Sequence, residues 1–161
     1  MNRKQSLPGR YSGFSAPCYT STRILSQYIE SYDGTKLAMD LVFPVNPPKE
    51  LPDHPLPVIL VASRGGRFDG TSGNGDAIPF RFLSHGYILA VVELRGCGAS
   101  YGTNNSFGNL EHCRDTIAAV RWLKQQPWCS GKVGMSGISN RAYIQLCTVS
   151  HFPDELDAIT P

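Results

Sequence analysis

The stretch around Gly137-Ile138-Ser139 constrains the fold more than any other part of the sequence. Residues 131–144 read GKVGMSGISNRAYI, so a short apolar strand at 133–136 runs directly into a helix-like segment. A connection of this kind holds a serine on a sharp strand-to-helix turn, with its hydroxyl clear of the sheet and able to act as a nucleophile. The pattern predicts a sheet flanked by helices, with a reactive serine at its edge.

Two serines compete for the nucleophile position. Ser139 has Gly137 two residues before it, but Arg141 occupies the second glycine of the usual G-x-S-x-G pattern. Ser136 has Gly134 two residues before it, but it would still lie in the strand. We therefore predict Ser139 as the nucleophile. Taken alone, the turn is equally compatible with a glycine-rich connection that carries an incidental serine.

Composition indicates an ordinary globular protein with one core. The chain has 161 residues, of which 41% are hydrophobic and 17% charged. Its 15 basic and 13 acidic residues give a net charge of +2, which argues against nucleic acid or an anionic membrane as a partner. We expect an irregular lead-in over residues 1–24 and a single domain over 25–161.

The apolar runs, the N-terminal segment and the cysteines indicate where the protein resides and whether it binds a metal. No apolar run approaches the roughly 20 residues of a membrane span, and residues 1–13 lack the apolar stretch of a secretory signal. We therefore expect a cytoplasmic protein. The five cysteines show neither CxxC nor paired spacing, so we expect reduced thiols and no metal site; they are residues 18, 97, 113, 129 and 147.

An antiparallel hairpin is predicted near the start of the domain. Residues 35–43 alternate between apolar and polar side chains, which is typical of a half-buried strand. The Asp33-Gly34 pair before it signals a tight turn from a preceding strand near 28–32. Residues 44–57 contain six prolines, which predicts a surface connection.

Strands and helices alternate in the rest of the chain. Continuous apolar runs predict strands that are buried on both faces of a parallel sheet, and amphipathic segments with caps predict helices. The fold class is therefore α/β, with a mostly parallel sheet after the hairpin. The expected elements are strand 58–62, loop 63–76, helix 77–85 ending at Gly86, strand 87–92, a helix capped by Asn109 and ending near Gln126, strand 133–136, helix 140–150 and strand 157–160.

Four segments together resemble a known family. In chain order they are DGTKLA at 33–38, ELRGCGASYG at 93–102, QPWCSG at 126–131 and GISNRA at 137–142. The set resembles the Xaa-Pro dipeptidyl-peptidase (S15) and cocaine-esterase-like branch of the α/β-hydrolases, from about residue 28 to the last. The resemblance implies the fold of that class and cleavage of an ester, amide or Xaa-Pro peptide bond in a small-molecule or peptide substrate.

The resemblance also assigns roles within the site. The family's serine motif, G-x-S-Y-x-G, makes Ser139 the nucleophile, although Asn140 stands for the tyrosine and Ala142 for the last glycine. The backbone N–H of Asn140 is then one oxyanion donor. The family's second donor is typically a tyrosine in the loop after the first parallel strand. This chain has no tyrosine there, and we assign the role to a backbone amide of Gly65 or Gly66.

The R-G-x-G-x-S element after strand 87–92 is expected to be structural, with Glu93 paired to Arg95. The glycines at 96–102 also mimic a dinucleotide-binding loop. Their spacing is G-x-G-x-x-x-G, however, and no helix start follows that could hold a pyrophosphate. We therefore expect no cofactor.

The acid and base of a hydrolase triad are not found in this sequence. In this fold both follow the serine in the chain, and three of the four histidines precede Ser139. His151 follows it by 12 residues, which along a helix is roughly 18 Å and too far for a general base. We expect the aspartate and histidine to lie beyond Pro161. The alternative is a non-catalytic hydrolase-like binding protein or an inactive fragment.

Overall fold

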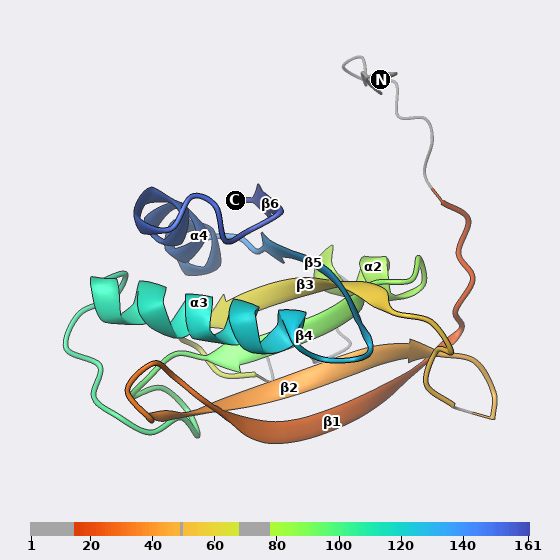
Figure 1. The fold of residues 1–161 in the computed structure, drawn as a ribbon, viewed down its shortest axis with the longest axis horizontal. Helices are drawn as coiled ribbons and strands as arrows, with labels where there is room; N and C mark the ends of the chain where they lie inside the picture. The colour runs from red at the N-terminus through yellow and green to blue at the C-terminus, as the bar shows by residue number, and fades with distance from the viewer. Residues whose placement is uncertain (1–14, 49, 68–77) are drawn as a thin grey trace, which may run out of the picture.

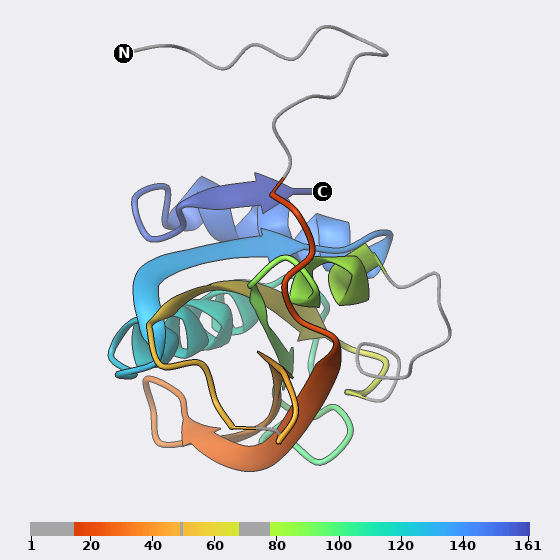
Figure 2. The same ribbon diagram turned by 90° about the vertical axis from the view of Figure 1, so that its right-hand side faces the viewer.

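The computed structural model describes residues 15–48, 50–67 and 78–161. Within them, one twisted sheet has the strand order β1-β2-β4-β3-β5-β6 (Figures 1 and 2). The first 14 residues of the expected lead-in, the end of the predicted loop 63–76 and Ala77 lie outside this description. The elements are β1 (Ser21–Glu30), β2 (Lys36–Val45), β3 (Leu56–Ser63), α2 (Ile78–Leu83), β4 (Ile88–Glu93), α3 (Leu110–Lys124), β5 (Cys129–Ser136), α4 (Asn140–His151) and β6 (Ala158–Thr160).

The predicted hairpin is confirmed. β1 and β2 pair antiparallel over their whole lengths, and Gly34 in the turn has a φ of 81°, which favours glycine. The backbone N–H of Ser31 donates to the carbonyl of Thr35 at 2.8 Å and closes the turn. β1 is longer than the strand expected near 28–32, because it begins at Ser21.

The prediction that β2 is half-buried is wrong. Every residue of β2 after Lys36 is buried, including Asp40 on the face that was expected to be polar. Two turns at the end of the sheet cover that face. The Oγ of Ser100 accepts a hydrogen bond from the N–H of Ala38 at 2.8 Å, and Arg67 forms an ion pair with Asp40 at 2.9 Å.

Both ends of the proline-rich connection are drawn into the sheet. β2 continues to Val45 and β3 begins at Leu56, so the connection is shorter than the expected 44–57. Pro44 is opposite Thr22 of β1, whereas the pairing of β2 with β4 ends at Val42. A residue without an N–H is tolerated where the strand on one side has already ended.

Strands β3, β4, β5 and β6 form the parallel part of the sheet, as predicted. The two central strands, β3 and β4, are buried on both faces apart from the half-buried Pro57. Because these strands run in one direction, the loops that follow β3, β4 and β5 meet at one edge, where α/β proteins place their ligand sites. We call this edge the carboxyl edge.

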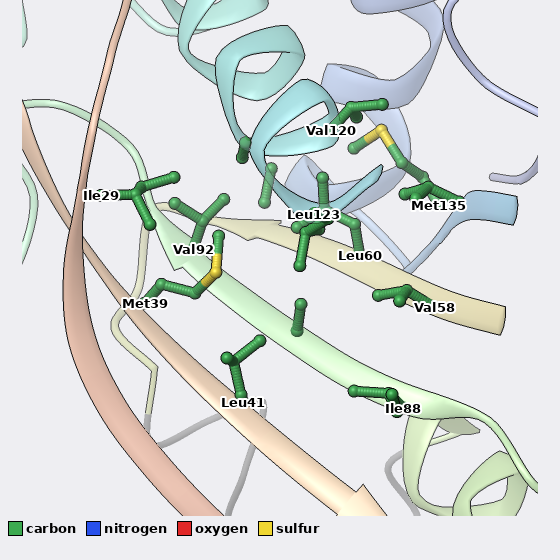
Figure 3. Close-up of a cluster of buried hydrophobic side chains, with 14 of the residues drawn as sticks. Ile29, Met39, Leu41, Val58, Leu60, Ile88, Val92, Val120, Leu123 and Met135 are labelled. Atoms are coloured by element: carbon green, nitrogen blue, oxygen red, sulfur yellow. The ribbon is translucent and has the colours of Figure 1, made fainter. Parts of the chain in front are cut away.

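The larger hydrophobic core lies between the sheet and helices α3 and α4. Figure 3 shows Val120 and Leu123 of α3 facing Leu60 of β3 and Val92 of β4. A smaller core on the opposite face lies against α2 and consists of Val42, Ile59, Val61, Leu83, Leu89 and Val91. Helices therefore cover both faces of the sheet.

The helix boundaries follow the predicted signals. The side chain of Asn109 accepts a hydrogen bond from the N–H of His112 at 2.9 Å and caps α3, which ends at Lys124 with Gln125 as its C-cap. Gly86 follows α2 with a φ of 83°, the left-handed conformation common after helices. These local signals bring α3 back over the sheet with its first turn at the carboxyl edge.

Candidate active site

Ser139 occupies a strained turn between β5 and α4. Its φ is 59° and its ψ is −123°, and it is the only non-glycine residue with a positive φ among those that the structure describes. The residue is exposed. It precedes α4, yet within the described part of the chain its hydroxyl makes no capping hydrogen bond to the helix. A strained strand-to-helix turn with an exposed serine is the arrangement that a nucleophile elbow requires.

The residues around Ser139 explain how the motif departs from G-x-S-x-G. Gly137 has a φ of 151°, and a Cβ placed on it would lie 2.4 Å from the Cβ of Arg141. Arg141 at the second glycine position is thus accommodated because residue 137 has no side chain. The competing Ser136 is the last residue of β5, is buried and pairs with Thr160 of β6.

The turn after β3 lies beside the serine turn. β3 and β5 are neighbours in the sheet, with Leu60 opposite Met135, and adjacent strands are about 4.8 Å apart. Ser63 and Ile138 each come three residues after that pair, so the two turns start at the same level of the carboxyl edge. Gly65 is exposed and Gly66 is half-buried, with a φ of 101°.

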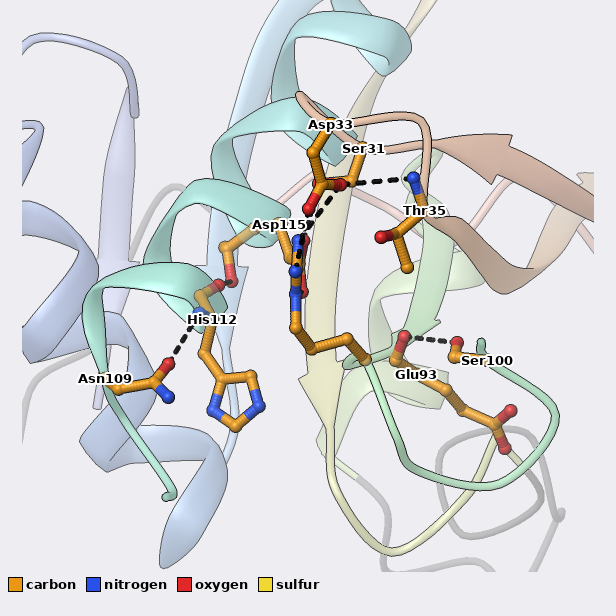
Figure 4. Close-up of polar contacts among 10 residues, drawn as sticks. Ser31, Asp33, Thr35, Glu93, Ser100, Asn109, His112 and Asp115 are labelled. Atoms are coloured by element: carbon orange, nitrogen blue, oxygen red, sulfur yellow. Dashed lines mark hydrogen bonds and ion pairs between the residues drawn. The ribbon is translucent and has the colours of Figure 1, made fainter. Parts of the chain in front are cut away.

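The expected pairing of Glu93 with Arg95 is wrong. The Oε2 of Glu93 accepts from the Nη1 of Arg67 at 2.8 Å, and its Oε1 accepts from the backbone N–H of Arg67 at 3.0 Å. Figure 4 shows the Glu93 carboxylate well apart from Asp33 and Asp115. Arg67 thus bridges two buried carboxylates, those of Glu93 and Asp40.

Arg95 instead forms ion pairs that join three segments of the chain. It binds Asp115 of α3 and Asp33 of the β1–β2 turn, and Asp115 also accepts from the Oγ of Ser31 (Figure 4). These carboxylates raise the pKa of the Arg95 guanidinium, and Asp115 contributes most. In return, the hydrogen bonds from Arg95 lower the pKa of Asp33 from 3.8 to about 2. The pairing of Arg95 with Asp33 and Asp115 was not predicted from the sequence, because these partners are far away in the chain.

Aromatic side chains connect the loop after β4 to the elbow helix. The ring of Phe107 lies 5.6 Å from that of Tyr143, which is one turn into α4. The guanidinium of Arg64 lies over the Phe107 ring at 5.3 Å, a cation–π distance. Tyr143 and the neighbouring Ile138 remain exposed, by 50% and 69%. The rim beside Ser139 therefore offers apolar surface.

None of the four histidines, all of which lie in the described residues, is placed as a base for Ser139. His54 and His85 precede β3 and β4, at the edge where the parallel strands begin. His151 is the last residue of α4, 12 helical residues after the serine. His112 lies at the carboxyl edge but is completely buried, and its Nδ1 accepts from the N–H of Gly108 at 3.2 Å. Burial lowers the pKa of His112.

In the part of the chain that the structure describes, no three His, Cys, Asp or Glu side chains cluster closely enough to hold a metal ion. Over the same residues, no helix combines the length and the apolar character needed to cross a bilayer.

The strand order, the parallel strands with helices on both faces and the serine turn define an α/β-hydrolase-type fold. The profile of the X-Pro dipeptidyl-peptidase (S15 family) matches residues 33–161, and the chain belongs to this family. The predicted resemblance and fold class are thus confirmed. Solved structures agree: a CocE/NonD family hydrolase from Staphylococcus aureus superposes with a TM-score of 0.72 at 22% identity, over 86% of this chain and 27% of that one.

Two curated relatives carry esterase names. Cocaine esterase from Rhodococcus sp. is 30% identical over 130 residues, which cover 80% of this chain and 21% of the relative. A Mycobacterium bovis protein, whose name describes it as a candidate serine esterase, is 30% identical over 149 residues, covering 83% of this chain and 23% of the relative. The chain therefore spans less than a quarter of the length of these relatives.

Proposed function

We propose that this chain is the nucleophile-bearing part of a serine hydrolase that cleaves an ester, amide or Xaa-Pro peptide bond. The observation that carries the proposal is the backbone of Ser139, which is strained at a φ of 59° and leaves an exposed side chain at the carboxyl edge. Such strain persists only where the surrounding structure holds it, and it gathers at functional sites. Membership of the S15 family supports the same chemistry.

In the proposed reaction, the Oγ of Ser139 attacks the carbonyl carbon of the substrate while a histidine takes the hydroxyl proton. The bond to the leaving group then breaks, the histidine returns the proton to that group, and water hydrolyses the acyl-enzyme by the same route. The backbone N–H groups of Asn140 and of Gly65 or Gly66 stabilise the negative oxygen. The histidine and the aspartate that orients it belong to the chain that follows residue 161 in the longer protein.

A fluorophosphonate probe tests this proposal, because it reacts with activated serines. We expect the longer protein to be labelled, Ser139→Ala to abolish labelling and Ser136→Ala to retain it. Labelling that persists in Ser139→Ala would refute the assignment of the nucleophile. The 161-residue chain alone should show no steady esterase turnover, because it lacks the base.

One observation favours a second function, a hydrolase-like protein that binds acyl compounds without cleaving them. Asn140 stands beside the serine where the family motif has tyrosine, and the turn after β3 has no tyrosine either. If the longer protein binds an ester substrate but neither hydrolyses it nor is labelled by the fluorophosphonate probe, this second function is correct and the first is wrong.

A further inference from the structure

The carboxylate of Glu93 joins the turns that follow β3 and β4. It accepts hydrogen bonds from the backbone N–H of Arg67 at 3.0 Å and from the backbone N–H of Ala99 at 2.7 Å. The side chain is at the end of β4 and is only 5% exposed. A buried carboxylate that accepts backbone N–H groups from two turns fixes both turns relative to the strand.

The peptide unit between Gly66 and Arg67 is held at both ends. The Oγ of Ser63 donates to the carbonyl oxygen of Gly66 at 2.9 Å, and Glu93 accepts from the N–H of Arg67. Because a peptide unit is planar, these two contacts set its orientation. The Arg67 amide is thereby committed to Glu93, and the chain is fixed at Gly66, directly after the amides of Gly65 and Gly66.

The position of the Glu93 carboxylate requires a glycine at residue 98 and a positive charge beside it. A Cβ on Gly98 would lie 2.2 Å from the Oε1 of Glu93, so only glycine lets the carboxylate reach both turns. Arg67 supplies the counter-charge and is itself anchored to Asp40 of β2 through its Nε at 2.9 Å. The turn after β3 is therefore fastened to β4 by Glu93 and to β2 by Asp40.

We propose that Glu93 is a positioning residue for the oxyanion hole. Its carboxylate holds the turn 63–67 so that the amide of Gly65 or Gly66 faces the oxygen that becomes negative when Ser139 attacks. This inference rests on the proposed function. Oxyanion hydrogen bonds strengthen in the transition state, so a displaced donor lowers kcat more than it raises KM.

The test compares Glu93→Gln with wild type in the longer protein, using an ester substrate. The glutamine side chain places an N–H group at a position where the carboxylate accepts a hydrogen bond. At least one of the hydrogen bonds to Arg67 or Ala99 is therefore lost, and the turn loosens. We expect kcat to fall by about 10- to 100-fold, somewhat less than removal of a whole oxyanion donor, with KM within about twofold. Affinity for a phenylboronic acid, whose tetrahedral adduct mimics the transition state, should fall in parallel with kcat/KM.

Glu155→Gln is the matched control, because it makes the same chemical change in an ion pair with Arg121 on the surface. We expect its kcat and KM to equal those of wild type. If Glu93→Gln does not fold, Ser63→Ala replaces it and should lower kcat in the same direction, with KM unchanged. Ser63→Thr keeps the hydroxyl, so this variant should retain most of the wild-type kcat that Ser63→Ala loses.

The outcomes separate this inference from the proposed function. An active wild type whose kcat is unaffected by Glu93→Gln and by Ser63→Ala overturns the positioning role alone. An equal loss of kcat in the Glu155→Gln control also overturns it. A wild type that neither hydrolyses the ester nor labels at Ser139 overturns the proposed function, and the inference with it.

Discussion

The guanidinium of Arg95 binds the carboxylate of Asp115 through two nitrogens, at 2.7 Å from Nε and 2.6 Å from Nη2. The Asp115 side chain is completely buried, and that of Arg95 is only 7% exposed. Arg95 also reaches Asp33 in the β1–β2 turn at 2.9 Å. The Arg95 guanidinium thus holds the first hairpin, the loop after β4 and helix α3 in a fixed arrangement.

Asp115→Asn should strongly destabilise the fold, because it leaves the buried guanidinium of Arg95 without its main counter-charge. We expect a loss of about 3–5 kcal/mol in the free energy of unfolding, measured by urea denaturation. Glu155→Gln removes an ion pair with the exposed Arg121 and should cost less than about 1 kcal/mol. Equal effects of the two substitutions would contradict a structural role for the buried pair.

Stability should fall in acid as two carboxylates are protonated. Asp33, bound by Arg95, and Asp157, bound by Lys132, have pKa values lowered from 3.8 to about 2. Because the folded pKa lies below the unfolded one, the stabilisation is complete above about pH 5 and is lost as the pH falls toward 2. Urea midpoints at pH 5 and pH 3 measure this loss.

The same pH experiment has an internal control. The double variant Asp33→Asn and Asp157→Asn should lower stability at pH 5 and lose less between pH 5 and pH 3. Both carboxylates are partly exposed, so 1 M salt should also weaken the pH dependence. A double variant with an unchanged pH dependence would show that other groups cause the loss.

Gly108→Ala should destabilise the contact between the loop after β4 and the elbow helix. A Cβ on Gly108, which has a φ of 72°, would lie 2.3 Å from the Cε1 of Tyr143. We expect a loss of about 1–3 kcal/mol from overpacking and backbone strain. In a Tyr143→Ala background the loss should shrink to about 1 kcal/mol, because only the backbone strain remains. Identical losses in both backgrounds would rule out the contact.

Gly137→Ala should distort the elbow, since its methyl group would collide with the Cβ of Arg141. We expect a loss of about 1–3 kcal/mol in stability, from overpacking, together with loss of fluorophosphonate labelling at Ser139. Gly131→Ala is the control: Gly131 also has a positive φ, of 80°, but a Cβ there meets nothing within 4 Å. That variant should lose stability yet keep its labelling.

The sequence predicted those features that depend on neighbouring residues. The Asp33-Gly34 turn, the Asn109 cap and Gly86 after α2 are local signals, and the structure confirms each of them. The strand-to-helix turn at 137–139 was predicted in the same way, because a glycine and a serine at that spacing suit one strained backbone conformation. The role of Ser139 as a nucleophile stays a prediction.

Residues whose partners are distant in the chain could not be paired from the sequence. Glu93 was matched to Arg95, two residues away, whereas its partner Arg67 is 26 residues away across the sheet. Asp40 was expected on an exposed face, and it is buried because Arg67 reaches over it. In both cases the ion pair that a charged side chain forms depends on how segments distant in the chain pack together.

By itself, the sequence determined the order of strands and helices along the chain and the serine on its strained turn, because hydrophobic periodicity, glycines and caps act over a few residues. The family was indicated by the resemblance of four short motifs. Only the tertiary structure decided which charges meet: Glu93 with Arg67, and Arg95 with Asp33 and Asp115. A buried charge requires a partner within a few ångströms, and sheet pairing brings together residues that the chain keeps far apart.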